Sequence, residues 1–304
     1  MKVLVTGASG FVGRRVVEQL LRHKHEVTVT TRSIAKAAVV LGSHCKYVLW
    51  PDTNELPPAE AFLGVDAVIN LMGENIGEKK WDEAQKKKIY DSRINGTKNL
   101  VEAMKALPKK PRVLVNASAV GIYGSHGDEA LDENASSGND FLATVCKDWE
   151  AEAMKAKDLG VRVVLLRTGV VFGKNGGALK KMLPIFKLGL GGKVGSGKQY
   201  MSWIHVDDLA SMYVAAVEDN TMNGPFNAVS PYAVTNAEFS KTLGKCLGRP
   251  AILPAPAFAI KKVLGEMSTI VLEGQKVVPT KLKQKNFQFR SANLEKTLKE
   301  SVRR

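Results

Sequence analysis

The chain has 304 residues, of which 44% are hydrophobic and 24% are charged, a composition typical of a soluble globular protein with one large or two modest domains. Its formal net charge is +14, but the lysines come in short runs without interleaved aromatic residues, which favours solvated faces over a nucleic-acid surface. Three scattered cysteines imply no disulfide framework, the apolar stretches are too short to span a bilayer, and a glycine-rich turn starting at Thr6 leaves no room for a signal peptide. We therefore expect a cytoplasmic protein that binds neither nucleic acid nor a membrane.

The first part of the chain predicts a phosphate-binding turn. An apolar strand candidate, Lys2–Thr6, runs directly into a glycine-rich turn, and a helical pattern follows from Phe11 to Arg22. Glycines let the backbone approach a pyrophosphate closely, and the start of a helix supplies free N–H groups and a partial positive charge. This strand–turn–helix context indicates a dinucleotide cofactor. The residues expected to hold it are Thr6, Gly7, Ser9, Gly10, Phe11, Val12 and Gly13.

Strand-like and helix-like segments alternate over the first two-thirds of the chain. Several strand candidates are continuous runs of Val, Ile and Leu, which is typical of strands covered on both faces. The pattern predicts an α/β fold with a doubly wound parallel sheet of the Rossmann type. The expected strands are Lys2–Thr6, Glu26–Thr31, Lys46–Leu49, Ala67–Leu71, Arg112–Ala117 and Val161–Arg167, and the expected helices are Phe11–Arg22, Asp82–Ala106 and Phe141–Leu159.

The pattern changes after Gly173. Residues 174–203 are rich in glycine and lysine around an apolar segment, Leu179–Leu190, and two short strands with a helix between them follow at 203–229. The last third predicts helices at Asn236–Leu247 and Pro256–Glu266, a basic irregular stretch, and a final helix from about Asn293. We expect a dinucleotide-binding domain at 1–173, to which 204–229 returns, and a smaller substrate lobe built from 174–203 and 230–304.

The residue after the second strand predicts the choice of nucleotide. A carboxylate about 20 residues past the glycine turn bonds the ribose 2′-hydroxyl of NAD. Here that place is taken by Arg32, whose guanidinium can grip a 2′-phosphate, with Ser33 as a helper. The sequence therefore predicts NADP(H) rather than NAD(H), although a solvated arginine at the strand end is the plainer alternative. Asp52, after the third strand, bonds the adenine or serves a turn.

Four motifs give the chain a family resemblance. They are the Thr-Gly-x-x-Gly-x-x-Gly turn at 6–13, the segment Ser118–Gly124, the loop Leu166–Gly173 and the late strand-to-helix segment Trp203–Ala210. With these motifs the chain resembles the extended short-chain dehydrogenases/reductases. Segments 73–76, 91–97, 254–259 and 264–266 are similar to an atypical branch, the epimerase family proteins with a small C-terminal domain.

The resemblance implies further contacts. Residues after the fourth strand and in the loop along the nicotinamide are expected to touch the cofactor, and others are expected to face the substrate. The expected cofactor contacts are Leu71, Met72, Gly73, Thr168, Val170 and Val171, and the expected substrate contacts are Glu74, Asn75, Gln199 and Trp203. For Trp203 a place in the core is the alternative. Family members often dimerise through two long helices, here 82–106 and 141–159, so a homodimer is an expectation from resemblance only.

The acid–base residues of the resembled group are missing. Its members use a Tyr-x-x-x-Lys pair to exchange a proton with a substrate hydroxyl. Here Leu142 stands in the place of the tyrosine, Cys146 in that of the lysine and Arg93 in that of a supporting asparagine, while Ala119 occupies the slot of the substrate-holding hydroxyl. The usual tetrad is therefore absent.

Two interpretations of function follow. In the first, the chain is an NADP(H)-dependent reductase or epimerase with rebuilt acid–base groups, acting on a small hydroxyl- or carbonyl-bearing substrate, with a nucleotide sugar as one candidate. In the second, it binds NADP(H) as a regulator or scaffold without turnover. No metal site is expected, because the histidines are dispersed. The catalytic candidates are Tyr123, Ser118, Arg93 and Cys146, with Lys147 and His205 as weaker ones.

Overall fold

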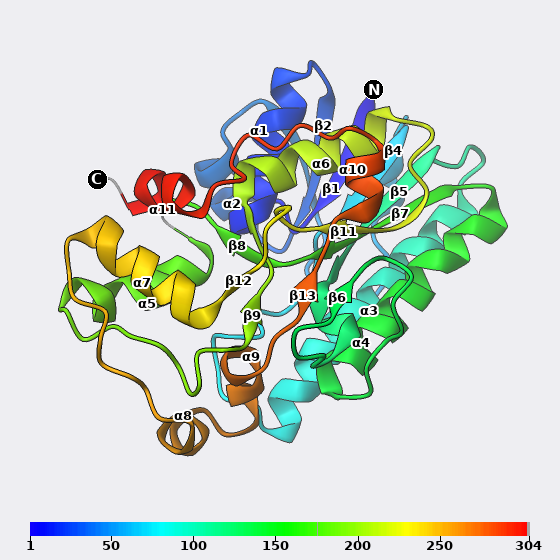
Figure 1. The fold of residues 1–304 in the computed structure, drawn as a ribbon. Helices are drawn as coiled ribbons and strands as arrows, with labels where there is room; N and C mark the ends of the chain where they lie inside the picture. The colour runs from blue at the N-terminus through cyan, green and yellow to red at the C-terminus, as the bar shows by residue number, and fades with distance from the viewer. Residues whose placement is uncertain (175, 303–304) are drawn as a thin grey trace.

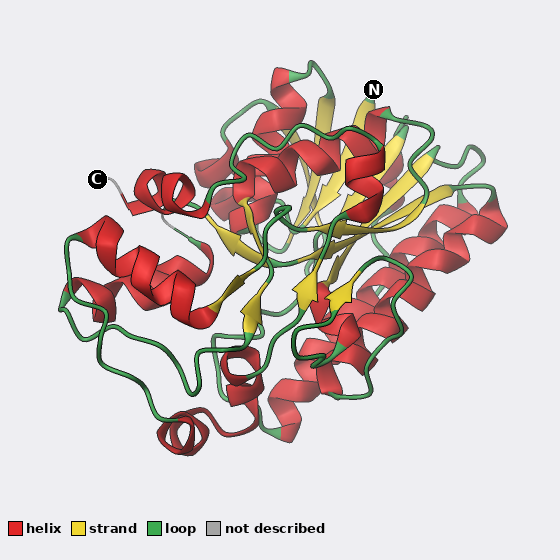
Figure 2. Cartoon of the chain, in the orientation of Figure 1, coloured by secondary structure: helices red, strands yellow, loops and turns green. Residues whose placement is uncertain are grey.

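The computed structural model describes residues 1–174 and 176–302, and its centre is a sheet of seven parallel strands (Figures 1 and 2). The strand order is β11-β7-β5-β4-β1-β2-β3, so the chain runs outward in one direction from β1 and then returns to continue in the other. This is the doubly wound α/β fold that the sequence predicts. The strands are β1 (Lys2–Thr6), β2 (Glu26–Thr31), β3 (Cys45–Leu49), β4 (Ala67–Asn70), β5 (Val113–Ala119), β7 (Arg162–Thr168) and β11 (Gly224–Ala228).

Helices cover both faces of this sheet. The side chains of Val3 and Val5 in β1 pack on one face and that of Leu4 on the other, and all three are fully buried. Such double burial explains why the strands are apolar without alternation. The helices α1 (Phe11–Arg22) and α6 (Val206–Glu218) supply the first apolar cluster, and α3 (Glu83–Ala106) contributes to the second.

The two long helices begin within one residue of the predicted starts, and each start is capped by an aspartate. The Asp82 carboxylate accepts a hydrogen bond from the Gln85 amide at the start of α3, at 2.7 Å. The Asp140 carboxylate does the same for Ala143 at the start of α4 (Phe141–Met154), at 2.9 Å. The expected last turn of the second helix is a 3₁₀ turn, Lys155–Leu159, and Gly160 in the left-handed conformation ends it.

The sequence analysis missed helix α2 (Ile34–Leu41). Ser33 caps it, and its residues are apolar except Lys36, so the sequence shows no contrast between an apolar and a polar helix face.

The remaining elements lie beside the sheet or return over it (Figure 1). Among the described residues, six short strands form three pairs outside the central sheet. These are β8 (Val170–Phe172) with β10 (Trp203–His205), β9 (Tyr200–Met201) with β12 (Val234–Thr235), and β6 (Ala130–Leu131) with β13 (Lys276–Val277). An aromatic stack of Phe172, Trp203 and Phe239 helps to hold this part together. Its helices are α5 (Gly177–Lys187), α7 (Asn236–Leu247), α8 (Ala257–Leu264), α9 (Thr269–Leu272), α10 (Thr280–Gln284) and α11 (Leu294–Val302).

Polar side chains tie the C-terminal segment to the sheet. The Asn227 amide of β11 donates to the Val278 carbonyl at 2.9 Å, and the Ser202 hydroxyl donates to the Gln275 carbonyl at 2.7 Å. The buried Asp208 carboxylate of α6 accepts the amides of Arg290 and Ser291, each at 3.0 Å. These bonds satisfy backbone groups that no strand or helix pairs, so they fix a segment that is poor in regular structure.

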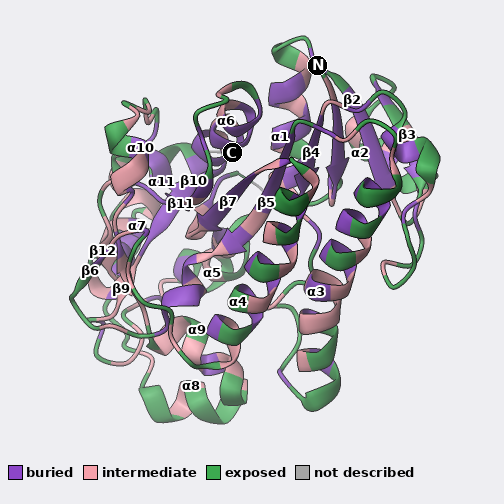
Figure 3. Cartoon of the chain, turned by 90° about the vertical axis from the view of Figure 1, so that its right-hand side faces the viewer, coloured by how far each residue is buried: buried purple, intermediate pink, exposed green. Residues whose placement is uncertain are grey.

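Exposed residues line the outer faces of α3 and α4 and much of α8 (Figure 3). The outer residues of α3 and α4 include Lys87, Lys98, Glu102 and Lys147. A homodimer through these two helices stays a prediction. Within residues 1–174 and 176–302, every helix is too short or too polar to cross a membrane.

Candidate dinucleotide-binding site

The glycine turn brings three chain segments into close contact. Gly7 has a φ of +65°, and a Cβ atom built on it would lie 2.6 Å from the Leu71 carbonyl oxygen after β4. A Cβ on Gly13 would lie 2.4 Å from the Gly7 carbonyl oxygen. Both positions therefore exclude any side chain, and the Gly10 amide closes the turn on the Gly7 carbonyl at 3.1 Å.

The N-terminus of α1 is open toward this turn. Its N-cap, Gly10, makes no side-chain hydrogen bond, and the first turn holds no acidic residue. The first amides of a helix lack intrahelical partners, so the N–H groups of Phe11, Val12 and Gly13 are free for a ligand. The residues present thus fit a diphosphate group, because a side chain that would fill the cradle or cap the amides is missing.

Arg32 lies directly after β2 and is exposed. Within the described residues its side chain makes no hydrogen bond and no ion pair, so it is available to an anion. Ser33 caps α2 through a long bond from the Lys36 amide, at 3.5 Å. Asp52 accepts both the backbone and side-chain N–H groups of Asn54, each at 2.9 Å, an arrangement that serves the turn, and its contact with adenine stays a prediction.

A buried polar network that the sequence analysis missed lies beneath the turn. The Asn70 carboxamide accepts the Thr6 hydroxyl at 2.6 Å and donates to Thr97 at 2.9 Å and to Asn116 at 2.7 Å. The indole N–H of Trp149 donates to the same Thr97 hydroxyl at 2.9 Å. The network locks the carboxyl ends of β1, β4 and β5 to α3 and α4. The only sequence signal is a polar residue ending or interrupting each apolar strand.

Two predicted catalytic residues, Tyr123 and Ser118, lie in a second buried cluster. The Tyr123 side chain is fully buried, and its hydroxyl donates to Asn227 at 2.6 Å and accepts from Arg167 at 3.0 Å. Burial raises the pKa of this phenol. The Ser118 hydroxyl donates to Glu150 at 2.6 Å. Because both hydroxyls are buried and partnered within the protein, their placement serves the structure and does not support the predicted proton transfer.

Cys146 is also buried, against Val120, Ile122 and Tyr123. Burial, together with the neighbouring Glu150, raises the pKa of its thiol to about 12, while Arg93 opposes the shift. At neutral pH this thiol is protonated and behaves as a small apolar group.

This placement makes a reactivity prediction. At pH 9 in the folded protein we expect iodoacetamide to modify the half-buried Cys246 well before Cys146, with peptide mass spectrometry as the readout. In urea the two thiols should react at similar rates, because unfolding removes the burial that keeps the Cys146 proton in place. Modification of Cys146 first, in the folded state, would contradict the structure.

Arg93 of α3 differs from the other catalytic candidates, because part of its guanidinium is free. Its Nη1 donates to the Ile89 carbonyl at 3.0 Å, and its Cζ lies 5.2 Å from the centre of the Trp149 ring. The other side packs on Gly73, where an added Cβ would lie 2.9 Å from Cζ. Burial lowers the pKa of the guanidinium.

The other predicted cofactor contacts follow strand ends. Leu71, Met72 and Gly73 continue from β4, and Leu71 touches the glycine turn. Thr168 ends β7 and donates to the Leu166 carbonyl at 3.1 Å, and β8 begins at Val170, whose amide donates to the Ser202 carbonyl at 2.7 Å. Val171 follows in β8 and is partly buried, as are Thr168 and Val170.

The predicted substrate residues separate into two groups. Glu74 and Asn75 lie on the loop after β4; the backbone amide of Glu74 donates to the Ser92 hydroxyl at 2.9 Å, and Asn75 is exposed. Gln199 and Trp203 lie outside that loop. Gln199 donates to the Val194 and Val271 carbonyls, at 3.0 and 2.8 Å, and thereby ties two loops together. Trp203 is fully buried in the aromatic stack, so the structure places it in the core and not against a substrate.

The two weaker candidates have plain roles. The ring of His205 caps α6 by accepting the Asp207 amide at 3.3 Å. Lys147 is exposed on the outer face of α4.

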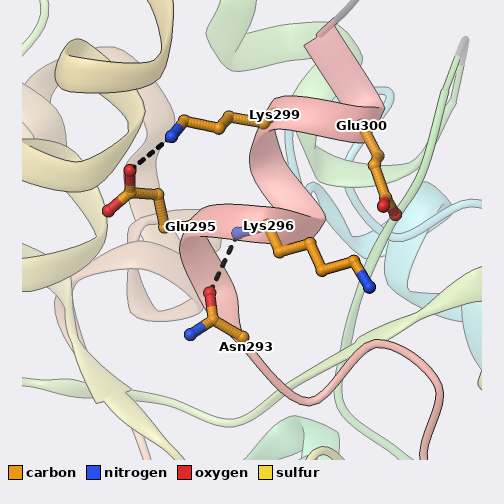
Figure 4. Close-up of a pocket in the computed structure, with 5 residues that line it drawn as sticks. All are labelled: Asn293, Glu295, Lys296, Lys299 and Glu300. Atoms are coloured by element: carbon orange, nitrogen blue, oxygen red, sulfur yellow. Dashed lines mark hydrogen bonds and ion pairs between the residues drawn. The ribbon is translucent and has the colours of Figure 1, made fainter.

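Two cavities adjoin α1 and α11. One of about 370 Å³ is lined by Phe11 at the start of α1, by His205 at the end of β10 and by the Arg15–Asp207 ion pair. The other, of about 580 Å³, is bounded by residues of α11 (Figure 4). In it Glu295 pairs with Lys299 at 2.6 Å and the Asn293 carboxamide caps Lys296 at 2.9 Å, so these polar groups satisfy one another. The described residues contain no group of three or more His, Cys, Asp and Glu side chains arranged to hold a metal ion.

Comparison with known proteins agrees with this geometry. The model of the NAD dependent epimerase/dehydratase family matches residues 3–229, which include the whole glycine turn and all seven strands of the sheet. The chain belongs to that family. A second model, a domain of unknown function (DUF1731), matches residues 255–301. The resemblance seen in the sequence, including its small C-terminal domain, is thereby confirmed.

Relatives in this family cover nearly the whole chain. The Arabidopsis thaliana epimerase family protein SDR39U1 homolog, chloroplastic, is 44% identical over 95% of this chain and 83% of its own length. Human epimerase family protein SDR39U1 is 37% identical over 99% of this chain and 100% of its own length. The crystal structure of the human protein (isoform 2) with NADPH superposes with a TM-score of 0.88 at 35% identity, covering 99% of each chain. A UDP-glucuronic acid 4-epimerase from Bacillus cereus shares the fold, with a TM-score of 0.81 at 18% identity.

Proposed function

We propose that this chain binds NADP(H) at the carboxyl ends of β1, β2 and β4. The single observation that carries the proposal is the open N-terminus of α1 over a side-chain-free glycine turn, with Arg32 at the end of the neighbouring strand, where no residue in the described part of the chain pairs with it. The turn suits a diphosphate, and the guanidinium suits a 2′-phosphate. A relative of 35% identity is described with NADPH, which supports the same cofactor here.

We further propose that the chain is an NADP(H)-dependent reductase or epimerase with a non-standard site. When bound, the nicotinamide would supply hydride transfer. Segments 174–203 and 230–304 would cover a small hydroxyl- or carbonyl-bearing substrate at the strand ends. Of the four predicted catalytic side chains, Arg93 keeps free polar atoms, whereas Tyr123, Ser118 and Cys146 are buried and held. A nucleotide sugar remains one candidate substrate, and a location in the cytoplasm remains a prediction from composition.

The same burial favours a second function. If the proton-transfer groups of the resembled enzymes are replaced or buried, the chain could bind NADP(H) as a regulator or scaffold without turnover. A reductase oxidises NADPH and so lowers the absorbance of the reduced nicotinamide, whereas a protein that only binds NADPH leaves the cofactor reduced.

The test is a titration followed by a turnover screen. NADPH and NADH are titrated into the purified chain by nicotinamide fluorescence, and we expect tighter binding of NADPH. The NADPH-loaded protein is then mixed with a panel of carbonyl compounds and sugar nucleotides, and the absorbance of the reduced nicotinamide is followed. A fall with any compound supports a reductase. An epimerase returns its hydride and shows no net fall, so each sugar nucleotide is also examined by chromatography for a new isomer. Tight binding with neither change supports the regulator. Tighter binding of NADH would refute the cofactor assignment.

A further inference from the structure

Arg93 differs from the other partly or fully buried arginines in its hydrogen-bond partners. Within the described residues these are Arg15, Arg93, Arg162 and Arg167. Arg15 binds Asp207 and Glu18, Arg162 donates to three backbone carbonyls, and Arg167 binds Glu150 through two bonds. Arg93 makes one hydrogen bond, to the Ile89 carbonyl, and has no carboxylate partner in the described part of the chain. A guanidinium has five N–H donors, so most of those on Arg93 are unused.

The unused donors lie together on one edge. Nη1 is taken by Ile89, which leaves Nε and Nη2, the adjacent pair that can form a fork with an oxyanion. Fully buried side-chain polar atoms without a partner are, among the residues described, Thr30 Oγ1 and Glu152 Oε2. The Arg93 nitrogens are not among them, so water reaches this edge.

The guanidinium lies at the end of β4. A Cβ on Gly73 would lie 2.9 Å from Cζ, 3.0 Å from Nη2 and 3.2 Å from Nε, so the backbone of residue 73 packs on a face of the guanidinium and leaves the hydrogen-bonding edge uncovered on that side. Gly73 is two residues from Leu71, whose carbonyl touches the phosphate turn. A ligand held by Arg93 would therefore lie at the end of β4, beside the strand-order reversal where ligands of doubly wound sheets bind.

The surroundings compensate the positive charge only weakly. The buried thiol of Cys146 stays protonated at neutral pH, because burial raises its pKa. Glu74, on the loop next to Gly73, accepts a hydrogen bond from the Gln85 side chain at 3.3 Å, and among the described residues it forms no ion pair with Arg93. Burial lowers the pKa of Arg93 by more than the charge of Glu74 raises it. The Trp149 ring lies 5.2 Å from Cζ and packs on the guanidinium without neutralising it.

We propose that Arg93 is the receptor for an oxyanion of the substrate, a carboxylate or a phosphate held by Nε and Nη2 next to the end of β4. This inference rests on the proposed function, because it takes the cofactor to occupy the neighbouring turn. It narrows the substrate class to small anionic hydroxy or carbonyl compounds. An anion would also offset the desolvation of a guanidinium that has no protein partner.

The experiment measures anion binding, not turnover. The protein, with and without saturating NADPH, is titrated by calorimetry with sodium acetate and with inorganic phosphate at constant ionic strength. We expect millimolar binding of at least one of them to the wild-type protein and at least tenfold weaker binding to Arg93→Gln. The matched control is Lys88→Gln, which removes an exposed cation from the same helix and should bind as the wild type does. Thermal unfolding of each variant checks that it is folded.

Four outcomes would overturn the proposal. The first is that the wild-type protein binds no anion, and the second is that Arg93→Gln binds anions as tightly as the wild type does. The third is that Arg93→Lys, which lacks the fork, binds anions as tightly as the wild type does. The fourth is a loss of NADPH affinity in Arg93→Gln, which would assign the residue to the cofactor. A wild-type protein that binds acetate or phosphate but neither nucleotide would instead refute the proposed function. The titrations without NADPH distinguish that result from a failure of the Arg93 assignment.

Discussion

Replacing Arg32 with glutamate is expected to weaken NADPH binding by more than tenfold and to remove the preference for NADPH over NADH. Charge-assisted hydrogen bonds contribute about 1.5–3 kcal/mol, which corresponds to about 10- to 150-fold in affinity. The glutamate would also repel a 2′-phosphate and could accept the 2′-hydroxyl of NADH. Arg32 is exposed and without a partner, so the substitution should leave the fold intact.

Fluorescence titration with both nucleotides measures the effect. The control is Arg112→Glu, an exposed arginine just before β5 and therefore at the amino ends of the parallel strands, away from Arg32 at the carboxyl end of β2, and it changes the net charge equally. If both variants lost NADPH affinity to the same extent, the general positive field of the protein would explain binding, and Arg32 would have no specific role. An unchanged preference in Arg32→Glu would likewise contradict the assignment.

Replacing Arg167 with methionine is expected to lower the free energy of unfolding by about 3–5 kcal/mol. Arg167 and Glu150 are buried and joined by two bonds of 2.9 Å, from Nε to Oε1 and from Nη2 to Oε2. Arg167 also donates to the Tyr123 hydroxyl at 3.0 Å and to the Glu133 carbonyl at 3.1 Å. The substitution therefore leaves a buried carboxylate without its cation and a buried carbonyl and phenol without a donor.

The double variant Arg167→Met with Glu150→Met is the control. Removing both charges of a buried pair is often neutral, so the double variant should recover much of the stability that the single variant loses. Urea unfolding followed by circular dichroism gives both free energies. If the two variants were equally unstable, packing and not the uncompensated charge would account for the loss.

The two buried polar systems explain how the cleft is built. The Asn70 network joins the strand ends beneath the phosphate turn, and the Arg167 cluster joins β5, β7 and β11 to the C-terminal segment through Asn227. Each is satisfied almost entirely within the protein, so each positions backbone rather than reacting. Arg93 lies beside them with its donors open, which is why it, and not Tyr123, is the side chain that the proposed chemistry involves.

The sequence alone predicted the parts whose signal is local. The glycine spacing at the start of the chain predicted the turn, because only a residue without a side chain tolerates the contacts of Gly7 and Gly13. Continuous apolar runs predicted the parallel strands, because such strands are covered on both faces. The helical patterns at 82–106 and 141–159 predicted the two long helices to within a residue at their starts. Helix α2 was missed because its sequence is apolar except at Lys36, which gives no contrast between two helix faces.

Only the tertiary structure decided the chemistry of the individual side chains. Tyr123 reads in the sequence as a proton donor, yet its hydroxyl is closed off by Asn227 and Arg167, which lie 104 and 44 residues away along the chain. Trp203 is fixed in the core by Phe172 and Phe239. Arg93 differs from the other inward arginines solely in what surrounds it. The burial and the hydrogen-bond partners of a side chain depend on contacts between segments that are far apart in the sequence, so a local sequence pattern does not predict them.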